Sequence, residues 1–170
     1  MVTVFEELGL SYEPVYLEFA QMKEPEFTKY NPNGRIPAII DHKNNDFVLW
    51  YVKVCTRRCL LSRLCHSHRE SNAIIQYLVD KYDPEYKISV PEGPEKYQQL
   101  QWLYFQASGQ GPYFGQLVWF MRYHQEQIPS AVERYAKEVR RVFGVLESVL
   151  SKQEWLVGNK FTVADITFIP

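Results

Sequence analysis

The apolar patterning of this chain changes once along its length, and that change sets the class of fold. Short β-prone runs occur at 11–19, 36–41 and 47–50. From residue 95 onward apolar residues recur with helical spacing, most clearly over 129–151, where the charged residues fall largely off the apolar face. The order helix, three strands, helix, linker and further helices predicts a small α/β lobe beside an all-α helical lobe.

Two helices are predicted in the α/β lobe. An apolar helical stripe over 2–8 precedes Gly9, where a helix often stops in a left-handed turn. A second stripe, over 74–79, follows Ser71, which can cap a helix, and Asp83-Pro84 disfavours its continuation. We therefore expect a helix on each side of the strand-like runs.

The division into lobes follows from the same patterns. Residues 85–94 have the composition of a linker, so we expect an α/β lobe over 1–84 and a helical lobe over 95–170. Within the helical lobe we expect one helix to end near Ala107 and the next to begin after Pro112, because proline disrupts the interior of a helix.

Composition favours a folded protein and excludes several partners. The chain has 170 residues, 46% of them hydrophobic, and a formal net charge of −1. Five basic residues and no acidic ones lie in 51–69, and acidic residues outnumber basic ones elsewhere, which argues against nucleic acid. No apolar stretch is long enough to span a bilayer, so we expect no membrane partner and a cytoplasmic protein. All three cysteines lie in 51–69, which excludes a disulfide framework across the fold.

The most specific motif is a turn followed by a strand. Asn31-Pro32-Asn33-Gly34 is a dense turn signal ahead of the apolar run 36–41, and a polar turn then leads to 47–50, which predicts an antiparallel hairpin. The segment 31–39 resembles the glutathione-binding loop of glutathione S-transferases, specifically the fungal type related to the yeast nitrogen-regulation prion protein. The resemblance implies a thioredoxin-like first lobe, incomplete because the first strand is absent from the sequence.

The resemblance also implies which residues bind glutathione. It implies a cis peptide bond before Pro37, with the main chain of Ile36 facing the cysteinyl unit of glutathione and Arg35 beside it. Glu70-Ser71 resembles the pair that receives the γ-glutamyl end at a helix start, where free N–H groups and the helix dipole favour a carboxylate. Taken alone, Glu70-Ser71 is more often only a helix cap.

Two further segments carry the resemblance into the helical lobe. The run 102–112 resembles the fourth helix of these transferases and the turn after it, and Thr162-Val163-Ala164-Asp165 resembles their capping box. Half-apolar side chains in between are candidates for an acceptor pocket or a dimer cleft, although an aromatic stripe is more often core. These are Trp119, Arg122 and Tyr123.

The implied function is that of a dimeric transferase that conjugates glutathione, its substrate, to electrophiles, with no metal. Such enzymes lower the pKa of the glutathione thiol so that the nucleophilic thiolate is populated. A glutathione-dependent disulfide reductase and a non-catalytic regulator of the nitrogen-regulation type remain open alternatives.

Residues 51–69 depart from the family pattern. Their removal would join Trp50 to Glu70, and the codons of this segment can carry an intron donor and acceptor in frame, so we hypothesise a retained intron, which transcript sequencing tests. A zinc or redox insert is the competing interpretation, but the spacing of its cysteines and histidines fits the usual zinc patterns poorly. The candidate ligands are Cys55, Cys59, Cys65, His66 and His68.

The ends of the sequence give a further expectation. The family residue that contacts the glutathione sulfur precedes Met1, so no residue of this sequence is assigned a catalytic role, and Pro170 falls inside the core helix that begins at Thr162. On this basis we expect impaired conjugation.

Overall fold

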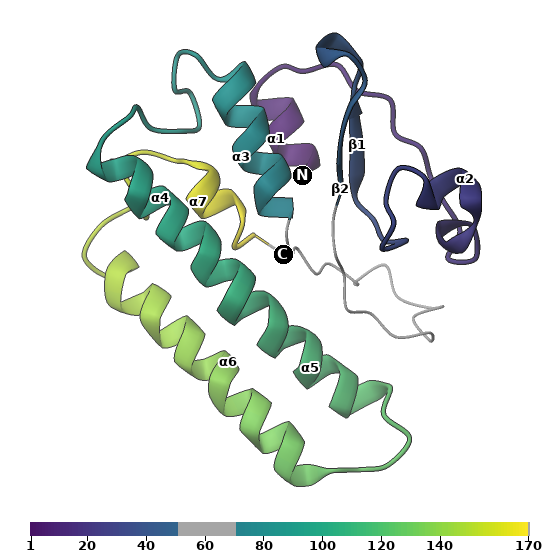
Figure 1. Ribbon diagram of the computed structural model, residues 1–170. Coiled ribbons are helices and arrows are strands. Elements are labelled where there is room, and N and C mark those ends of the chain that lie inside the picture. The colour runs from purple at the N-terminus through teal and green to yellow at the C-terminus, as the bar shows by residue number, and fades with distance from the viewer. Residues whose placement is uncertain (51–70, 170) are drawn as a thin grey trace.

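A computed structural model describes residues 1–50 and 71–169, which form two lobes (Figure 1). The α/β lobe contains α1 (Val2–Glu7), α2 (Pro25–Thr28), β1 (Ala38–Asp41), β2 (Phe47–Trp50) and α3 (Ser71–Tyr82). The helical lobe contains α4 (Pro94–Phe105), α5 (Gly111–Arg122), α6 (Pro129–Leu150) and α7 (Val163–Ile166). Short 3₁₀ turns cover Gln21–Lys23 and His42–Asn44, and a π-helical turn covers Gln106–Gln110.

The predicted hairpin is confirmed. Strands β1 and β2 pair antiparallel, with Ala38 opposite Trp50 and Asp41 opposite Phe47. The turn between them contains Asn45 and Asp46, both with positive φ, a conformation that the short polar side chains of Asn and Asp tolerate better than most. The helix over 2–8 is also confirmed as α1.

The strand predicted over 11–19 is wrong. No residue of this segment belongs to a strand, and Val15 and Tyr16 are 77% and 89% exposed. A strand needs a neighbouring chain to pair with its N–H and C=O groups, and no described segment forms a ladder with this one. The β-prone residues alone therefore do not make a strand, because β propensity reflects packing on a sheet surface.

One apolar core joins the two lobes. It combines residues of α1, α3, the connection after α3 and α7, and β1 and β2 contribute Ile39 and Leu49 at its edge. The fully or nearly fully buried members are Val4, Ile74, Ile75, Leu78, Val79, Ile88, Val163 and Ile166. Helix α7 therefore packs against the α/β lobe although it follows α6 in the chain. The lobe boundaries at 84 and 95 stay predictions.

The break predicted before Pro112 is also wrong, because α4 and α5 form one continuous helical rod (Figure 1). The π-helical turn Gln106–Gln110 joins them, and Pro112 is in the first turn of α5. A proline inside an α-helix removes a hydrogen bond and clashes with the carbonyl four residues earlier. The wider π turn changes the backbone there, so the rod continues through the proline.

The remaining helices agree with expectation. Helix α6 runs antiparallel beside α5, and Thr162 begins α7 with the predicted capping box. In this box the Thr162 N–H donates to Asp165 Oδ2 at 2.9 Å. Within residues 1–50 and 71–169 no helix has both the length and the apolar character needed to cross a membrane.

Candidate functional site

The loop that precedes β1 is organised by one buried side chain, Asn31. Its Nδ2 donates to the carbonyl of Arg35 at 2.6 Å, and its Oδ1 accepts from the N–H of Asn33 at 2.9 Å. Its own carbonyl accepts from the N–H of Gly34 at 2.8 Å. Because Asn31 is fully buried, these hydrogen bonds replace those that its amide would make with water, and they hold the loop in one shape.

Gly34 lets this loop pack directly on the preceding turn. Its φ is +60°, and a Cβ atom at this position would lie 2.6 Å from the carbonyl oxygen of Met22. The Nζ of Lys23 also donates to the carbonyl of Asn33 at 3.0 Å. Only glycine combines this left-handed conformation with so close an approach. The sequence indicated the turn, but the contact with Met22 is visible only in the structure.

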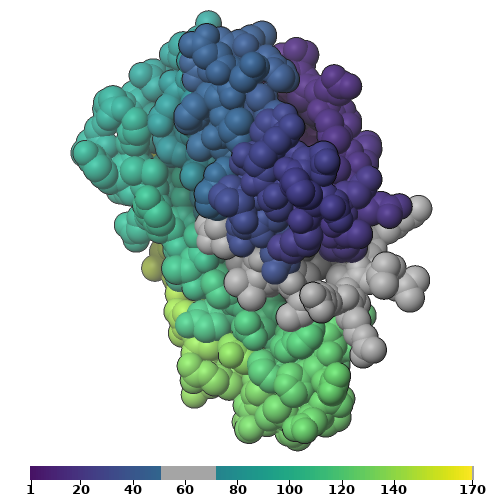
Figure 2. Space-filling model, turned by 45° about the vertical axis from the view of Figure 1, so that its right-hand side comes forward, coloured from purple at the N-terminus to yellow at the C-terminus, as the bar shows by residue number. Residues whose placement is uncertain are grey.

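Ile36 and Pro37 follow at the entrance to β1. The peptide bond between them is cis, as the resemblance implies. The Ile36 side chain is 47% exposed, and no described residue forms a hydrogen bond with its main chain. Arg35 is half-buried. In the space-filling view the purple-to-blue part of the chain, which includes the segments before β1, lies on the face turned toward the viewer (Figure 2).

The start of α3 lies at the same end of the lobe as the start of β1. Asp41 is the last residue of β1, and its Oδ2 accepts from the hydroxyl groups of Tyr77 and Tyr82, each at 2.5 Å. These tyrosines belong to the second half of α3, so β1 and α3 run in the same direction and begin at the same end (Figure 1). Ser71 is the first residue of α3. Glu70 lies outside the described residues, as does the whole of 51–69.

The hydrogen bonds that Tyr77 and Tyr82 make to the Asp41 carboxylate change the pKa of all three side chains. Burial raises the pKa of Asp41, but hydrogen bonds from Tyr77, Tyr82 and the Lys43 N–H outweigh it and leave the pKa below its ordinary value. The hydrogen bond to Asp41 raises the pKa of Tyr82 to about 12. Burial first, and then the bond to Asp41, raises the pKa of Tyr77. The cluster therefore keeps a charged Asp41 between two neutral tyrosines near pH 7.

Asn72 connects the first turn of α3 to the helical lobe. Its Nδ2 donates to the carbonyl of Leu103 at 2.6 Å and to Oε1 of Gln106 at 3.3 Å. Gln106 is itself buried and donates to Oε1 of Gln110 at 2.9 Å. Asn72 is not among the site residues predicted from the sequence. In the sequence, a polar amide stands directly before an apolar helical stripe. This pattern indicates that the amide has a hydrogen-bond partner, but it does not identify the partner.

The aromatic candidates of the helical lobe cluster near the end of α5. The rings of Trp119 and Tyr123 stack with centroids 6.0 Å apart, whereas Arg122 is exposed. Phe120 stacks on His124 and Tyr135 beside them. Their role in an acceptor pocket stays a prediction.

The described residues contain no group of three His, Cys, Asp or Glu side chains placed to hold a metal ion. The cysteines and histidines weighed as zinc ligands all lie in 51–69, outside the described part of the chain. Neither the zinc interpretation nor the intron hypothesis is therefore tested.

Family models match both ends of the chain. The model described as "Glutathione S-transferase, N-terminal domain" matches residues 1–51, and "Glutathione S-transferase, C-terminal domain" matches residues 112–170. Glutathione S-transferase 1 of Schizosaccharomyces pombe is 46% identical over 172 residues, covering 99% of this chain and 67% of the relative.

Solved structures show the same fold. The glutathione transferase URE2P6 of Phanerochaete chrysosporium, in complex with oxidized glutathione, is 59% identical with a TM-score of 0.84, covering 98% of this chain and 69% of that one. Ure2p5 of the same organism, cocrystallized with 1-(S-glutathionyl)-2,4-dinitrobenzene, is 52% identical with a TM-score of 0.77, covering 98% of this chain and 65% of that one.

Proposed function

Because this chain belongs to the glutathione S-transferase family, in its fungal URE2-related branch, we propose that it binds glutathione and transfers the glutathionyl sulfur to an electrophile. The observation that carries the proposal is the loop built on Asn31. It presents the main chain of Ile36 at the start of β1, at the same end of the lobe as the start of α3. A short peptide that lies between these two starts meets main-chain groups on one side and a helix N-terminus on the other.

The cysteinyl and γ-glutamyl units of glutathione then each have a partner. The Ile36 N–H and C=O pair with the cysteinyl unit as a neighbouring strand would, which fixes a peptide through its main chain. The first turn of α3 offers unpaired N–H groups and a partial positive charge to the γ-glutamyl carboxylate. The family resemblance assigns Ser71 and Glu70 to the γ-glutamyl end as well, and assigns Arg35 and Pro37 to the part of the site beside Ile36. Asn72 holds this helix start against α4.

Conjugation is the reaction that we propose first, because a relative that is 52% identical was crystallized with a glutathionyl dinitrobenzene. In that reaction the glutathione thiolate attacks the electrophilic carbon, a carbon–sulfur bond forms, and the leaving group departs with its electron pair. Disulfide reduction is the second candidate, because a relative that is 59% identical holds oxidized glutathione. In this case the thiolate attacks a disulfide sulfur and releases a thiolate.

A matched pair of variants at one position tests the binding mode. Retention on glutathione-agarose should survive Ile36→Ala, because the main chain is intact, and should fall strongly in Ile36→Pro, which removes the N–H donor. Circular dichroism of both variants checks that each is folded. Equal retention of two folded variants would show that the Ile36 N–H does not hold the ligand.

Two substrates separate the candidate reactions. Both substrates are tested with glutathione. Turnover of 1-chloro-2,4-dinitrobenzene would support conjugation, whereas turnover of hydroxyethyl disulfide but not of 1-chloro-2,4-dinitrobenzene would support reduction. Retention on glutathione-agarose without turnover of either substrate would instead favour the non-catalytic regulator. The same assays on a chain that lacks residues 51–69 test whether that segment affects binding.

We also propose that two copies of the chain associate. Tyr97 and Tyr104 lie seven residues apart on α4, hence on one face, and each is 71% exposed. Large aromatic side chains on one exposed face are typical of an interface. Light scattering during size-exclusion chromatography should give twice the mass of one chain, and Tyr104→Glu should shift the protein toward the monomer.

A further inference from the structure

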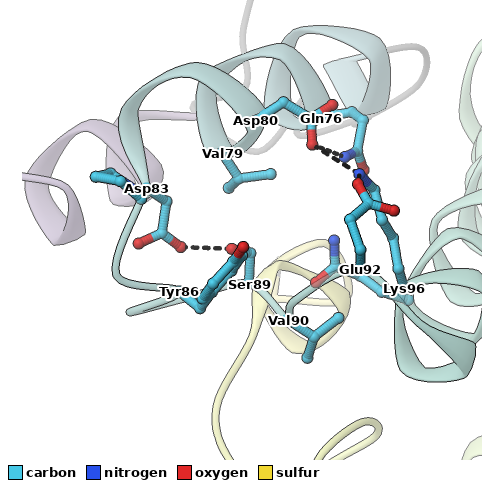
Figure 3. A pocket seen from close by; sticks show the side chains of 11 residues that line it. Gln76, Val79, Asp80, Asp83, Tyr86, Ser89, Val90, Glu92 and Lys96 are labelled. Atoms are coloured by element: carbon cyan, nitrogen blue, oxygen red, sulfur yellow. Dashed lines mark hydrogen bonds and ion pairs between the residues drawn. The ribbon is translucent and has the colours of Figure 1, made fainter.

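A cavity of about 120 Å³ lies beside Gln99, toward the C-terminal end of α3 (Figure 3). The charged side chains that line it are already paired. Lys96 bridges Asp80 and Glu92, and Asp83 accepts hydrogen bonds from the segment that follows α3. We therefore assign no ligand to this cavity. Chemistry that the proposed reaction does not use lies instead in the loop before β1.

This loop contains Asn33-Gly34, the only Asn-Gly dipeptide of the sequence. Such a dipeptide can lose ammonia when the glycine nitrogen attacks the Cγ atom of the asparagine. The new C–N bond closes a five-membered succinimide ring, the Cγ–Nδ2 bond breaks, and ammonia leaves with the proton of the glycine N–H. Water then opens the ring to aspartate or isoaspartate. Glycine permits this attack better than other residues, because it has no Cβ atom in the way.

The closed loop opposes the attack. The Gly34 N–H donates to the carbonyl of Asn31 at 2.8 Å, so the turn holds the proton that the nitrogen must lose before it attacks. Gly34 is also buried against the carbonyl oxygen of Met22, where even a Cβ atom would not fit. We therefore expect the nitrogen to reach Cγ of Asn33 only after the turn has opened.

Two other contacts of the loop favour the reaction. The Nζ of Lys23 donates to the carbonyl oxygen of Asn33 at 3.0 Å, and this oxygen belongs to the peptide group whose nitrogen attacks. A positive charge there stabilises the anion that forms when the nitrogen loses its proton. Nδ2 of Asn33, the atom that leaves, is buried and has no hydrogen-bond partner in the described part of the chain. Its departure therefore breaks no hydrogen bond within that part.

We propose that Asn33 is a deamidation site controlled by the opening of this loop. The reaction proceeds in the open loop and stops in the closed one. The isoaspartyl product adds one carbon atom to the main chain before Gly34, so Gly34 no longer returns to its contact with Met22. The modification thus makes a reversible opening permanent. The inference is independent of glutathione binding.

Peptide mapping by mass spectrometry tests this proposal. The wild-type chain is incubated at neutral pH, either folded or unfolded in guanidinium chloride, and deamidation at Asn33 is followed over time. We expect the folded chain to react at least about tenfold more slowly, because the hydrogen-bonded loop must first open. Equal rates in the two states would overturn the proposal.

Two variants separate opening of the loop from unfolding of the whole chain. Asn31→Ala removes the hydrogen bonds of the buried amide to Asn33 and Arg35 and should speed deamidation of the folded chain about tenfold. Asp165→Ala weakens the cap of α7 in the helical lobe and should leave the rate at Asn33 unchanged. If Asn31→Ala does not fold, Asn31→Ser replaces it, because a serine hydroxyl can still accept from the Asn33 N–H. An unchanged rate in the folded Asn31 variant, or equal acceleration by Asp165→Ala, would contradict control by the loop.

Discussion

Each lobe contains a loop held by one polar side chain, and the two loops differ in how deeply the residues that follow or flank that side chain are buried. In the α/β lobe, the Asn31 side chain bonds to Asn33 and Arg35, and the loop after it leaves Ile36 exposed. In the helical lobe, Asp165 caps α7 through Thr162 and also accepts from the N–H of Leu156 at 2.9 Å, nine positions away. The first side chain shapes the loop that we propose binds glutathione, and the second ties a helix start to the preceding loop and thereby to the core.

The difference shows why similar hydrogen bonds serve different purposes. The loop at Asn31 leaves Ile36 exposed, so its hydrogen bonds stabilise a segment at the surface. The bonds of Asp165 lie beside Thr162, Val163 and Ala164, which are completely buried. Breaking them disturbs the core of the whole molecule. We therefore expect larger losses of stability from Asp165 than from Asn31.

The largest effect is expected for Asp165→Ala. It removes the acceptor of the Leu156 and Thr162 N–H groups and of the Thr162 hydroxyl, so the free energy of unfolding should fall by about 3 kcal/mol. Urea denaturation measures the change. Glu154→Ala, an exposed acidic residue near the same loop, is the control and should change the stability little. A loss below that of Asn31→Ala would reverse the ranking of the two loops.

Asn31→Ala should lower the unfolding free energy by about 2 kcal/mol, because it removes the hydrogen bonds of a buried amide to Asn33 and Arg35. It should also weaken retention on glutathione-agarose, because the loop no longer holds Ile36 in place. Pro32→Ala, at the exposed neighbouring position, is the control for stability. A destabilised variant with full retention would show that the loop shape does not govern binding.

Gly34→Ala should cost about 1–2 kcal/mol of stability. The residue has a φ of +60°, and the new Cβ would collide with the Met22 carbonyl. The matched change Gly144→Ala lies in the middle of α6, where a Cβ meets no atom within 4 Å, and should stabilise by about 0.5–1 kcal/mol. Thermal denaturation should therefore shift in opposite directions for the two variants, and shifts of the same sign would contradict this account.

The smallest expected effect is a change in how stability depends on pH, through the cluster of Asp41, Tyr77 and Tyr82. The pKa of Tyr82 is raised to about 12 from about 10 in the unfolded chain, so its contribution to stability is complete below pH 10 and is lost as pH rises toward 12. The lowered pKa of Asp41 has the opposite sign, and its contribution is lost as pH falls through the folded value. Tyr82→Phe should remove part of the alkaline loss, measured by urea denaturation across that range. An unchanged alkaline profile would show that Tyr82 is not the responsible group.

Much of the fold was predictable because the residue patterns that indicate it each lie within one short segment. The hairpin, α3, α6 and the capping box at Thr162 each depend on spacing within one segment of the chain. The strand predicted over 11–19 failed because a strand depends on a partner elsewhere in the chain. The break predicted before Pro112 failed because a π turn, which no residue pattern indicated, lets the helix continue.

For the candidate site, the sequence by itself determined the turn at 31–34, the proline of the cis bond and the helix start at Ser71. Those features follow from residue types and short spacings. Only the tertiary structure decided that Asn31 organises the loop, that Gly34 touches Met22 and that Asp41 joins β1 to α3. The hydrogen bond from Asn72 to Leu103 and the cavity beside Gln99 were also decided only by the tertiary structure. Each depends on which distant segments pack together, and that packing is set by the shared apolar core of both lobes, so no single segment of the sequence specifies it.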